Sequence, residues 1–319
     1  DSLERIPRND PLRLTILVAT SGDTGGAVAA AFYQRPWVDV VVLYPTGLVS
    51  ARQEKQLACW GRNVRTLAVA GTFDDCQRMV KEAFVDPALG RDLLLSSANS
   101  INVGRLLPQM AYYAQSSLEL FRRDGRAPNY IVPSGNLGNV AACLWARMAG
   151  LPIGEVMLAT NANLTVPDFL RTGEWHPRPS LATLASAMDV GNPSNMERLR
   201  WLFPDLHDLR GAFSACSVSD DEIRASIRRD YAEYGQTWCP HTATAAHLYR
   251  QLPAERRKER WVLVGTAHPA KFNDVVEPLI DAAVPVPPAL ADLLSLPSLQ
   301  QDVAPHLDDL RNVLKGNPA

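Results

Sequence analysis

The chain has 319 residues, of which 46% are hydrophobic, and a net charge of −2. This length suits one large or two ordinary globular domains, and the charge argues against a main function in binding nucleic acid or anionic membranes. No apolar run approaches the 18 residues of a membrane span, and residues 1–10 are too charged for a signal peptide. Five cysteines without C-x-x-C spacing favour a reduced protein of the cytoplasm.

Short apolar runs alternate with amphipathic segments through the first 160 residues. The runs predict strands at 13–20, 38–44, 64–69, 130–133 and 155–160, and the segments between them predict helices at 26–31, 51–60, 72–85, 101–123 and 140–149. Strands that alternate with helices at this spacing indicate an α/β fold with mainly parallel sheets.

The second half is less regular. Prolines between residues 165 and 209 favour loops and short helices. Beyond them we expect helices at 220–234, 273–280 and 307–314, one buried strand at 261–265 and a proline-spaced connector at 285–297. We place the domain boundary near residue 104, which gives a smaller α/β domain (1–104) and a larger one (105–319).

A glycine-rich loop, Ser21-Gly22-Asp23-Thr24-Gly25-Gly26, follows the first predicted strand. Its glycines let an anion approach the backbone, and the next helix offers free amides and a positive dipole end. A plain turn from strand to helix explains the loop equally well. A dinucleotide site is not favoured, because the G-x-G-x-x-G spacing is absent and the second strand ends in Tyr44-Pro45.

A second loop of this kind, Ser134-Gly135-Asn136-Leu137-Gly138-Asn139, lies between a predicted strand and a predicted helix. Its backbone amides can form a cup around a phosphate, although the G-K-[ST] of a P-loop is missing. Two anion-binding loops in one chain suggest that two anionic groups are bound.

Two further stretches carry polar side chains. The first, Ser96–Arg105, combines hydroxyl and amide groups with an arginine that could bind a carboxylate or phosphate, but it also fits a helix cap with a solvated arginine. The second, Gly265–Phe272, places Thr266 and His268 after a buried strand. No H-x-x-H or Cys/His cluster indicates a metal site, and no G-x-S-x-G motif indicates a serine hydrolase.

Seven segments together resemble the threonine synthase family in sequence, order and spacing. They are ATSGDTGGA (19–27), SANSINVGR (97–105), VPSGNLGN (132–139), LATNANLTVPDFL (158–170), NPSNMERL (192–199), PHTATA (240–245) and GTAHPAKF (265–272). The resemblance implies a pyridoxal-phosphate enzyme of fold type II, with two open, mainly parallel sheets and flanking helices. It also implies conversion of O-phospho-L-homoserine and water into L-threonine and phosphate, the last step of threonine biosynthesis.

The resemblance also implies roles for individual residues. For the cofactor, pyridoxal 5′-phosphate, they are Gly135, Asn136, Leu137, Gly138 and Asn139 around its phosphate and Thr266 facing its ring nitrogen. For the substrate, they are Thr20, Ser21, Gly22, Asp23, Thr24, Ser97, Asn99, Ser100, Asn102 and Arg105. Leu137 stands where the family usually has phenylalanine, a change that a cup of backbone amides should tolerate. No nucleic acid or membrane partner is expected, and the chain could be a monomer or a dimer.

One departure concerns the lysine that forms the Schiff base with the cofactor in this family. Its T-L-A-F-K-D-like motif is absent, and only five lysines accompany 27 arginines. None of the five lies in a matching motif, so no catalytic residue is assigned. The resemblance implies that the chain begins just after this lysine and is inactive by itself.

Two other functions remain open from the sequence. A paralogue without the lysine could bind phosphorylated ligands without catalysis. A pyridoxal-phosphate-dependent phospho-lyase could instead eliminate phosphate and release a keto acid.

Overall fold

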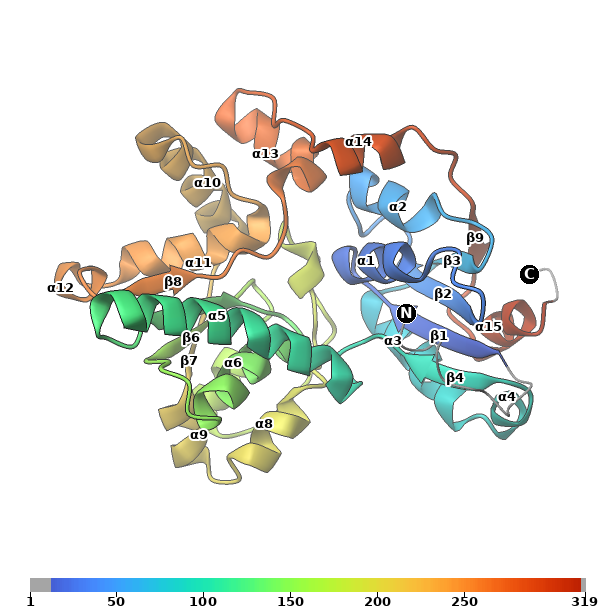
Figure 1. Cartoon of the computed structure of the whole chain (residues 1–319), viewed down its shortest axis with the longest axis horizontal. Coiled ribbons are helices and arrows are strands. Elements are labelled where there is room, and N and C mark those ends of the chain that lie inside the picture. The colour runs from blue at the N-terminus through green and yellow to red at the C-terminus, as the bar shows by residue number, and fades with distance from the viewer. Residues whose placement is uncertain (1–12, 317–319) are drawn as a thin grey trace. The chain divides into compact units, whose positions relative to one another are not determined.

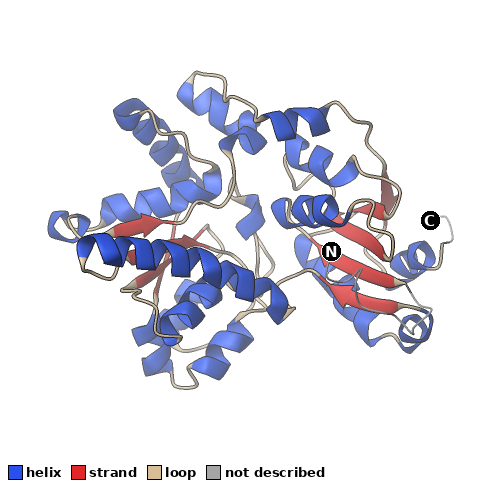
Figure 2. Cartoon of the chain, viewed as in Figure 1, coloured by secondary structure: helices blue, strands red, loops and turns tan. Residues whose placement is uncertain are grey.

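The computed structural model describes residues 13–316, which form two compact α/β units (Figure 1). Unit 1 comprises the described residues up to Asn99 together with those from Val286 onward, and unit 2 comprises Ser100–Pro285. Each unit has its own sheet with helices packed on it (Figure 2). The predicted α/β class with two mainly parallel sheets is confirmed.

The sheet of unit 1 has five parallel strands in the order β4-β1-β2-β3-β9. The strands are β1 (Leu14–Ala19), β2 (Val38–Pro45), β3 (Val64–Val69), β4 (Leu94–Ser97) and β9 (Gln300–Val303). The helices are α1 (Asp23–Phe32), α2 (Ala51–Ala58), α3 (Phe73–Val85), α4 (Pro87–Asp92), α14 (Pro288–Leu294) and α15 (Leu307–Leu314). The central strands are almost wholly buried, as expected for a parallel sheet with helices on its faces.

The end of the chain returns to unit 1, which differs from the predicted division at residue 104. Strand β9 pairs in parallel with β3, from Thr66↔Gln300 to Val69↔Val303. Only Val303 of this strand is buried. Its sequence, QQDV, lacks the apolar run that marks a central strand, and the sequence therefore did not predict it. Residues 286–316 therefore complete the first sheet instead of extending the second unit.

The sheet of unit 2 has four parallel strands in the order β7-β6-β5-β8. The strands are β5 (Asn129–Pro133), β6 (Val156–Thr160), β7 (Ser214–Ser217) and β8 (Trp261–Leu263). The α-helices are α5 (Leu106–Asp124), α6 (Gly138–Met148), α7 (Thr165–Thr172), α8 (Met196–Leu202), α9 (Leu206–Ala212), α10 (Asp220–Tyr234), α11 (Pro240–Gln251), α12 (Ala254–Arg257) and α13 (Asn273–Ile280). The 3-10 helices are η2 (Val103–Arg105), η3 (Ser186–Met188) and η4 (Pro269–Phe272).

Two helices, α11 and α6, pack on the sheet of unit 2. Helix α11 packs on β5 and β6, and nine of its residues are buried. Helix α6 packs on the same two strands and contacts α5 (Figure 1). Between residues 13 and 316, none of the helices combines the length and the apolar character needed to cross a bilayer.

Candidate active site

Three loops meet at one edge of the sheet of unit 2. Strands β5, β6 and β8 are parallel neighbours, so their carboxyl ends lie on the same side. The loop at Ser134 follows β5, Asn161 follows β6, and Gly265 with Thr266 follows β8 by one residue. This edge is where ligands bind in open parallel sheets, and it joins two of the loops that the sequence singles out.

The Ser134–Asn139 loop presents backbone amides at the start of α6. Leu137 is the N-cap residue and adopts a left-handed conformation, with φ of 61°. The first helical bond runs from Ala141 N to Leu137 O (2.9 Å), so the amides of Gly138, Asn139 and Val140 have no acceptor within the helix. Such amides, with the positive end of the helix dipole, suit a phosphate group.

Gly135 has a close neighbour on the far side of the loop. A Cβ built there would lie 2.6 Å from Met188 Cα and 2.7 Å from Met188 O. No side chain fits into that space without backbone movement. The glycine therefore lets the loop backbone lie directly against the segment that contains Met188.

Side-chain bonds fix the shape of this loop. Asn136 donates to Ser100 Oγ (3.0 Å) and accepts from Ser194 N (2.7 Å). Asn195 donates to Ser100 Oγ (2.8 Å) and to Asn136 O (2.7 Å). The Asn136 amide and the Ser100 hydroxyl thus brace the loop itself, although Ser100 was predicted to contact the substrate.

Thr266 lies at the other end of this edge, beside the start of α11. Its amide donates to Thr242 Oγ1 (3.3 Å), and its hydroxyl is 3.9 Å from Cys239 Sγ. Burial acts to raise the pKa of the Cys239 thiol, but hydrogen bonding and charge from His241 lower the pKa to about 7. Thr266 therefore lies beside the Cys239 sulfur and the Thr242 hydroxyl, and it remains exposed.

A cavity of about 570 Å³ in unit 2 brings two of the predicted cofactor residues together. Thr266 and Asn139 both line it, as do Tyr113 and Tyr130. The Tyr113 hydroxyl donates to Asn139 Oδ1 (2.5 Å), and burial raises the pKa of Tyr113 well above its usual value. None of the five lysines, all of which lie within residues 13–316, lines this cavity.

Three of the predicted substrate residues of unit 1 shape their own loops through their side chains. Thr20 Oγ1 accepts from the amides of Gly22 and Gly25 (3.0 Å each). Asn99 accepts from Ala19 N (2.9 Å) and donates to Ala19 O, and Ser97 Oγ accepts from Asn99 N (3.1 Å). Ser21, Asp23 and Thr24 lie at the start of α1 and remain predicted contacts.

The remaining predicted substrate residues, Asn102 and Arg105, lie in unit 2. Asn102 is the N-cap of η2 and accepts from Gly104 N (3.0 Å). Arg105 is half-buried, and burial lowers the pKa of its guanidinium. Within residues 13–316 no carboxylate or other acceptor pairs with the Arg105 side chain, which leaves its guanidinium for the predicted phosphate contact.

Thr20→Val should destabilise unit 1 by about 1–3 kcal/mol, because two buried amides would lose their acceptor. Thr46→Val is the matched control, since Thr46 is exposed. Chemical denaturation of both variants measures the difference. Equal midpoints for the two would show that Thr20 does not hold the loop.

One group of polar residues received no role from the sequence. Asn161, Asn163, Thr183 and Asp189 form a hydrogen-bonded cluster after β6. Asn161 and Asn163 belong to the LATNANLTVPDFL segment, which gave a resemblance but no local pattern of ligand binding, and Thr183 and Asp189 lie outside all of the quoted motifs. The signal that could have found them is the position of Asn161 directly after a buried strand, where ligands usually gather.

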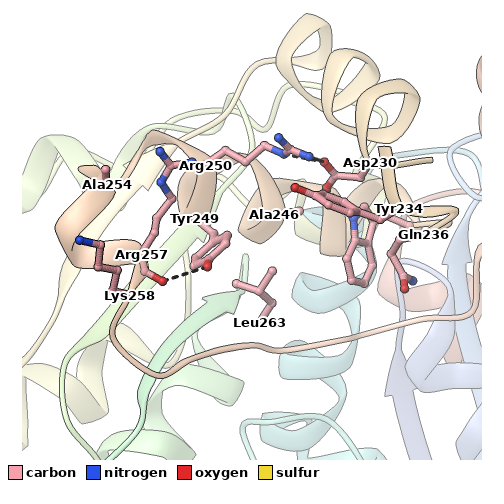
Figure 3. A pocket seen from close by; sticks show the side chains of 11 residues that line it. Asp230, Tyr234, Gln236, Ala246, Tyr249, Arg250, Ala254, Arg257, Lys258 and Leu263 are labelled. Atoms are coloured by element: carbon pink, nitrogen blue, oxygen red, sulfur yellow. Dashed lines mark hydrogen bonds and ion pairs between the residues drawn. The ribbon is translucent and has the colours of Figure 1, made fainter. Parts of the chain in front are cut away.

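A second cavity of unit 2, of about 500 Å³, has none of the predicted site residues in its lining (Figure 3). Helices α10, α11 and α12 supply most of its lining. Arg250 pairs there with Asp230 (2.6 Å) and Glu233 (2.8 Å) and lies over the Tyr234 ring. The paired charges of Arg250 and Asp230 therefore form part of the wall of this cavity.

The comparisons with known proteins agree with this geometry. A family model described as "Pyridoxal-phosphate dependent enzyme" matches residues 4–267, and one described as "Threonine synthase, C-terminal" matches residues 242–314. Threonine synthase of Serratia marcescens is 43% identical over 307 residues, which cover 96% of this chain and 71% of the relative.

Solved structures give the same result. The crystal structure of threonine synthase from Escherichia coli superposes with a TM-score of 0.89 at 41% identity, covering 96% of this chain and 71% of that one. The structure of PLP-bound threonine synthase from Brucella melitensis superposes with a TM-score of 0.82 at 33% identity, with the same coverage.

Proposed function

Since the chain belongs to the threonine synthase family of pyridoxal-phosphate-dependent enzymes, we propose that its substrate is O-phospho-L-homoserine. The products would be L-threonine and phosphate, which makes the enzyme a carbon–oxygen lyase acting on a phosphate ester. The observation that carries this proposal is the amide cup at the start of α6, which lies at the same sheet edge as Thr266. The cytoplasm, favoured by the cysteine pattern, is part of the same proposal.

The residues of unit 2 fit the cofactor. The free amides of Gly138 and Asn139 would hold its phosphate. Gly135 has no side chain and so lets this loop lie directly against Met188. Thr266 would face the ring nitrogen with an uncharged hydroxyl. When bound, the cofactor supplies an electron sink for negative charge on the substrate carbon that carries the amino group.

We propose substrate contacts in both units and describe those of each unit separately. In unit 1, Ser21, Asp23 and Thr24 would bind the amino-acid end of the substrate at the start of α1, while Thr20 keeps the loop in shape. In unit 2, Arg105 would bind the substrate phosphate, because its guanidinium can form two parallel bonds to phosphate oxygens. Asn102 would place Arg105 by capping the turn that contains it.

The test is the conversion of O-phospho-L-homoserine by the natural full-length protein supplied with pyridoxal phosphate. We expect phosphate and L-threonine in equal amounts. Phosphate with a keto acid and ammonia would identify a phospho-lyase instead. Cofactor or substrate binding without any product would identify a non-catalytic binding protein.

Thr266→Val should lower turnover about tenfold, because the ring nitrogen would lose a hydrogen bond worth roughly 1 kcal/mol or more. Thr266→Ser keeps the hydroxyl and should stay within about twofold of the wild type. Steady-state kinetics of the two variants measure this difference. Equal turnover in both would remove Thr266 from the site.

A further inference from the structure

A buried polar cluster in unit 2 holds the segment Thr183–Val190. Asn161, which is fully buried, donates to Asp189 Oδ1 (2.7 Å) and to Thr183 Oγ1 (2.9 Å). Thr183 donates to both carboxylate oxygens of Asp189, from its hydroxyl (2.7 Å) and from its amide (3.0 Å). Asn163 adds a bond to Leu181 O (3.0 Å). The Asp189 carboxylate is therefore an acceptor surrounded by donors.

This segment is also the wall against which the phosphate cup lies. Met188 is the neighbour of Asp189, and a Cβ added to Gly135 would lie 2.6 Å from the Met188 Cα. The Met188 amide donates to Ala185 O (2.9 Å), and the Asp189 amide donates to Ser186 O (3.0 Å). A shift of Asp189 would therefore move Met188 and, with it, the backbone that supports Gly135.

The same segment reaches the other end of the site. Ala187 N donates to His241 Nε2 (3.0 Å), and His241 lies in the first turn of α11. The N-cap of that helix is Cys239, whose sulfur lies 3.9 Å from the Thr266 hydroxyl. One segment thus connects the cup at Gly135 with the helix start beside Thr266.

We propose that Asp189 is a positioning residue that sets the shape of the phosphate cup through Met188 and Gly135. The identity of the bound group rests on the proposed function, whereas the coupling between the two segments does not. The Asp189 carboxylate bonds to Asn161 and Thr183, and it acts on the cup through the position of Thr183–Val190.

The donors around Asp189 suit a carboxylate better than an amide. Burial raises the pKa of Asp189 to about 6, while bonds from Thr183 and Asn161 oppose that rise. The group is mostly ionised at pH 7.5 and accepts on both oxygens. In Asp189→Asn, the new NH₂ group would face either the Thr183 amide or the Asn161 amide, which are themselves donors.

The test uses the natural full-length protein and three variants. Asp189→Asn changes the acceptor, Thr183→Val removes one donor while keeping the side-chain shape, and Asp281→Asn is a control at an exposed helix end of the same unit. Amide hydrogen exchange is followed at residues 134–138 and 185–190. Binding of pyridoxal phosphate and of pyridoxal, which lacks the phosphate, is measured by titration.

We expect exchange in Asp189→Asn to become about tenfold faster in both segments, with a smaller change in Thr183→Val and none in the control. Pyridoxal phosphate should bind about tenfold more weakly to Asp189→Asn, and pyridoxal should change less than twofold. Faster exchange at 185–190 alone, or an equal loss for both ligands, would overturn the proposal. A wild type that binds neither ligand would refute the proposed function, and the exchange data would still decide the role of Asp189.

Discussion

Gly135→Ala should weaken the binding of pyridoxal phosphate by about 10- to 100-fold. The added methyl would meet Met188 Cα at 2.6 Å and Met188 O at 2.7 Å, and both are backbone atoms that cannot rotate away. Forcing an extra carbon into such a contact costs about 1–3 kcal/mol, and here the strain acts on the loop that presents the amides. Titration of the apoprotein with pyridoxal phosphate measures the loss.

Gly211→Ala is the matched control for this substitution. Gly211 lies in α9 of the same unit, and a Cβ there meets nothing within 4 Å. Alanine is also the better helix residue, so this variant should keep its affinity and gain a few tenths of a kcal/mol in stability. If Gly135→Ala bound the cofactor as tightly as Gly211→Ala, the cup would lie elsewhere in the chain.

Arg250→Met should destabilise unit 2 by about 3–5 kcal/mol, because it leaves the Asp230 carboxylate buried without its charged partner. The Asp230 side chain is 7% exposed, and it also accepts from Trp238 Nε1 (2.8 Å). Denaturant unfolding followed by circular dichroism measures the change.

Two further variants separate the ion pair from general effects. Arg228→Met removes an exposed arginine from the same helix as Asp230 and should change stability by less than about 0.5 kcal/mol. Asp230→Asn in the Arg250→Met background should recover part of the loss, because the buried charge is gone while the acceptor for Trp238 remains. No recovery in the double variant would mean that Arg250 stabilises α11 through its packing on Tyr234 alone.

The strongest elements of the fold could be predicted from sequence because their signals are local. The run VDVVVLY forms β2, and the helices predicted at 51–60 and 72–85 form α2 and α3, which begin after capping boxes at Ser50 and Thr72. The short strands β4, β7 and β9 were not predicted, because few of their residues are buried, and only β4 contains part of an apolar run, which is three leucines long. Their pairing depends on neighbours that lie far away in the sequence.

The candidate site divides in the same way. The glycine-rich loop at Ser134 was predicted from its residues, and its place at the start of α6 agrees with that prediction. The tasks of individual side chains could not be read from the sequence, since Asn99, Ser100 and Asn136 bond to atoms brought near by the fold. Whether such a residue holds a ligand or a loop depends on partners that no motif names.

The pairing of β9 with β3 affects how the protein folds during its synthesis on the ribosome. More than 200 residues, including all of unit 2, are synthesised between Val69 and Gln300. At a synthesis rate of about 5–20 residues per second, the edge of β3 remains unpaired for on the order of ten to fifty seconds. During that interval unit 2 can fold as a complete piece, whereas the first sheet exposes an unpaired apolar edge that chaperones could recognise.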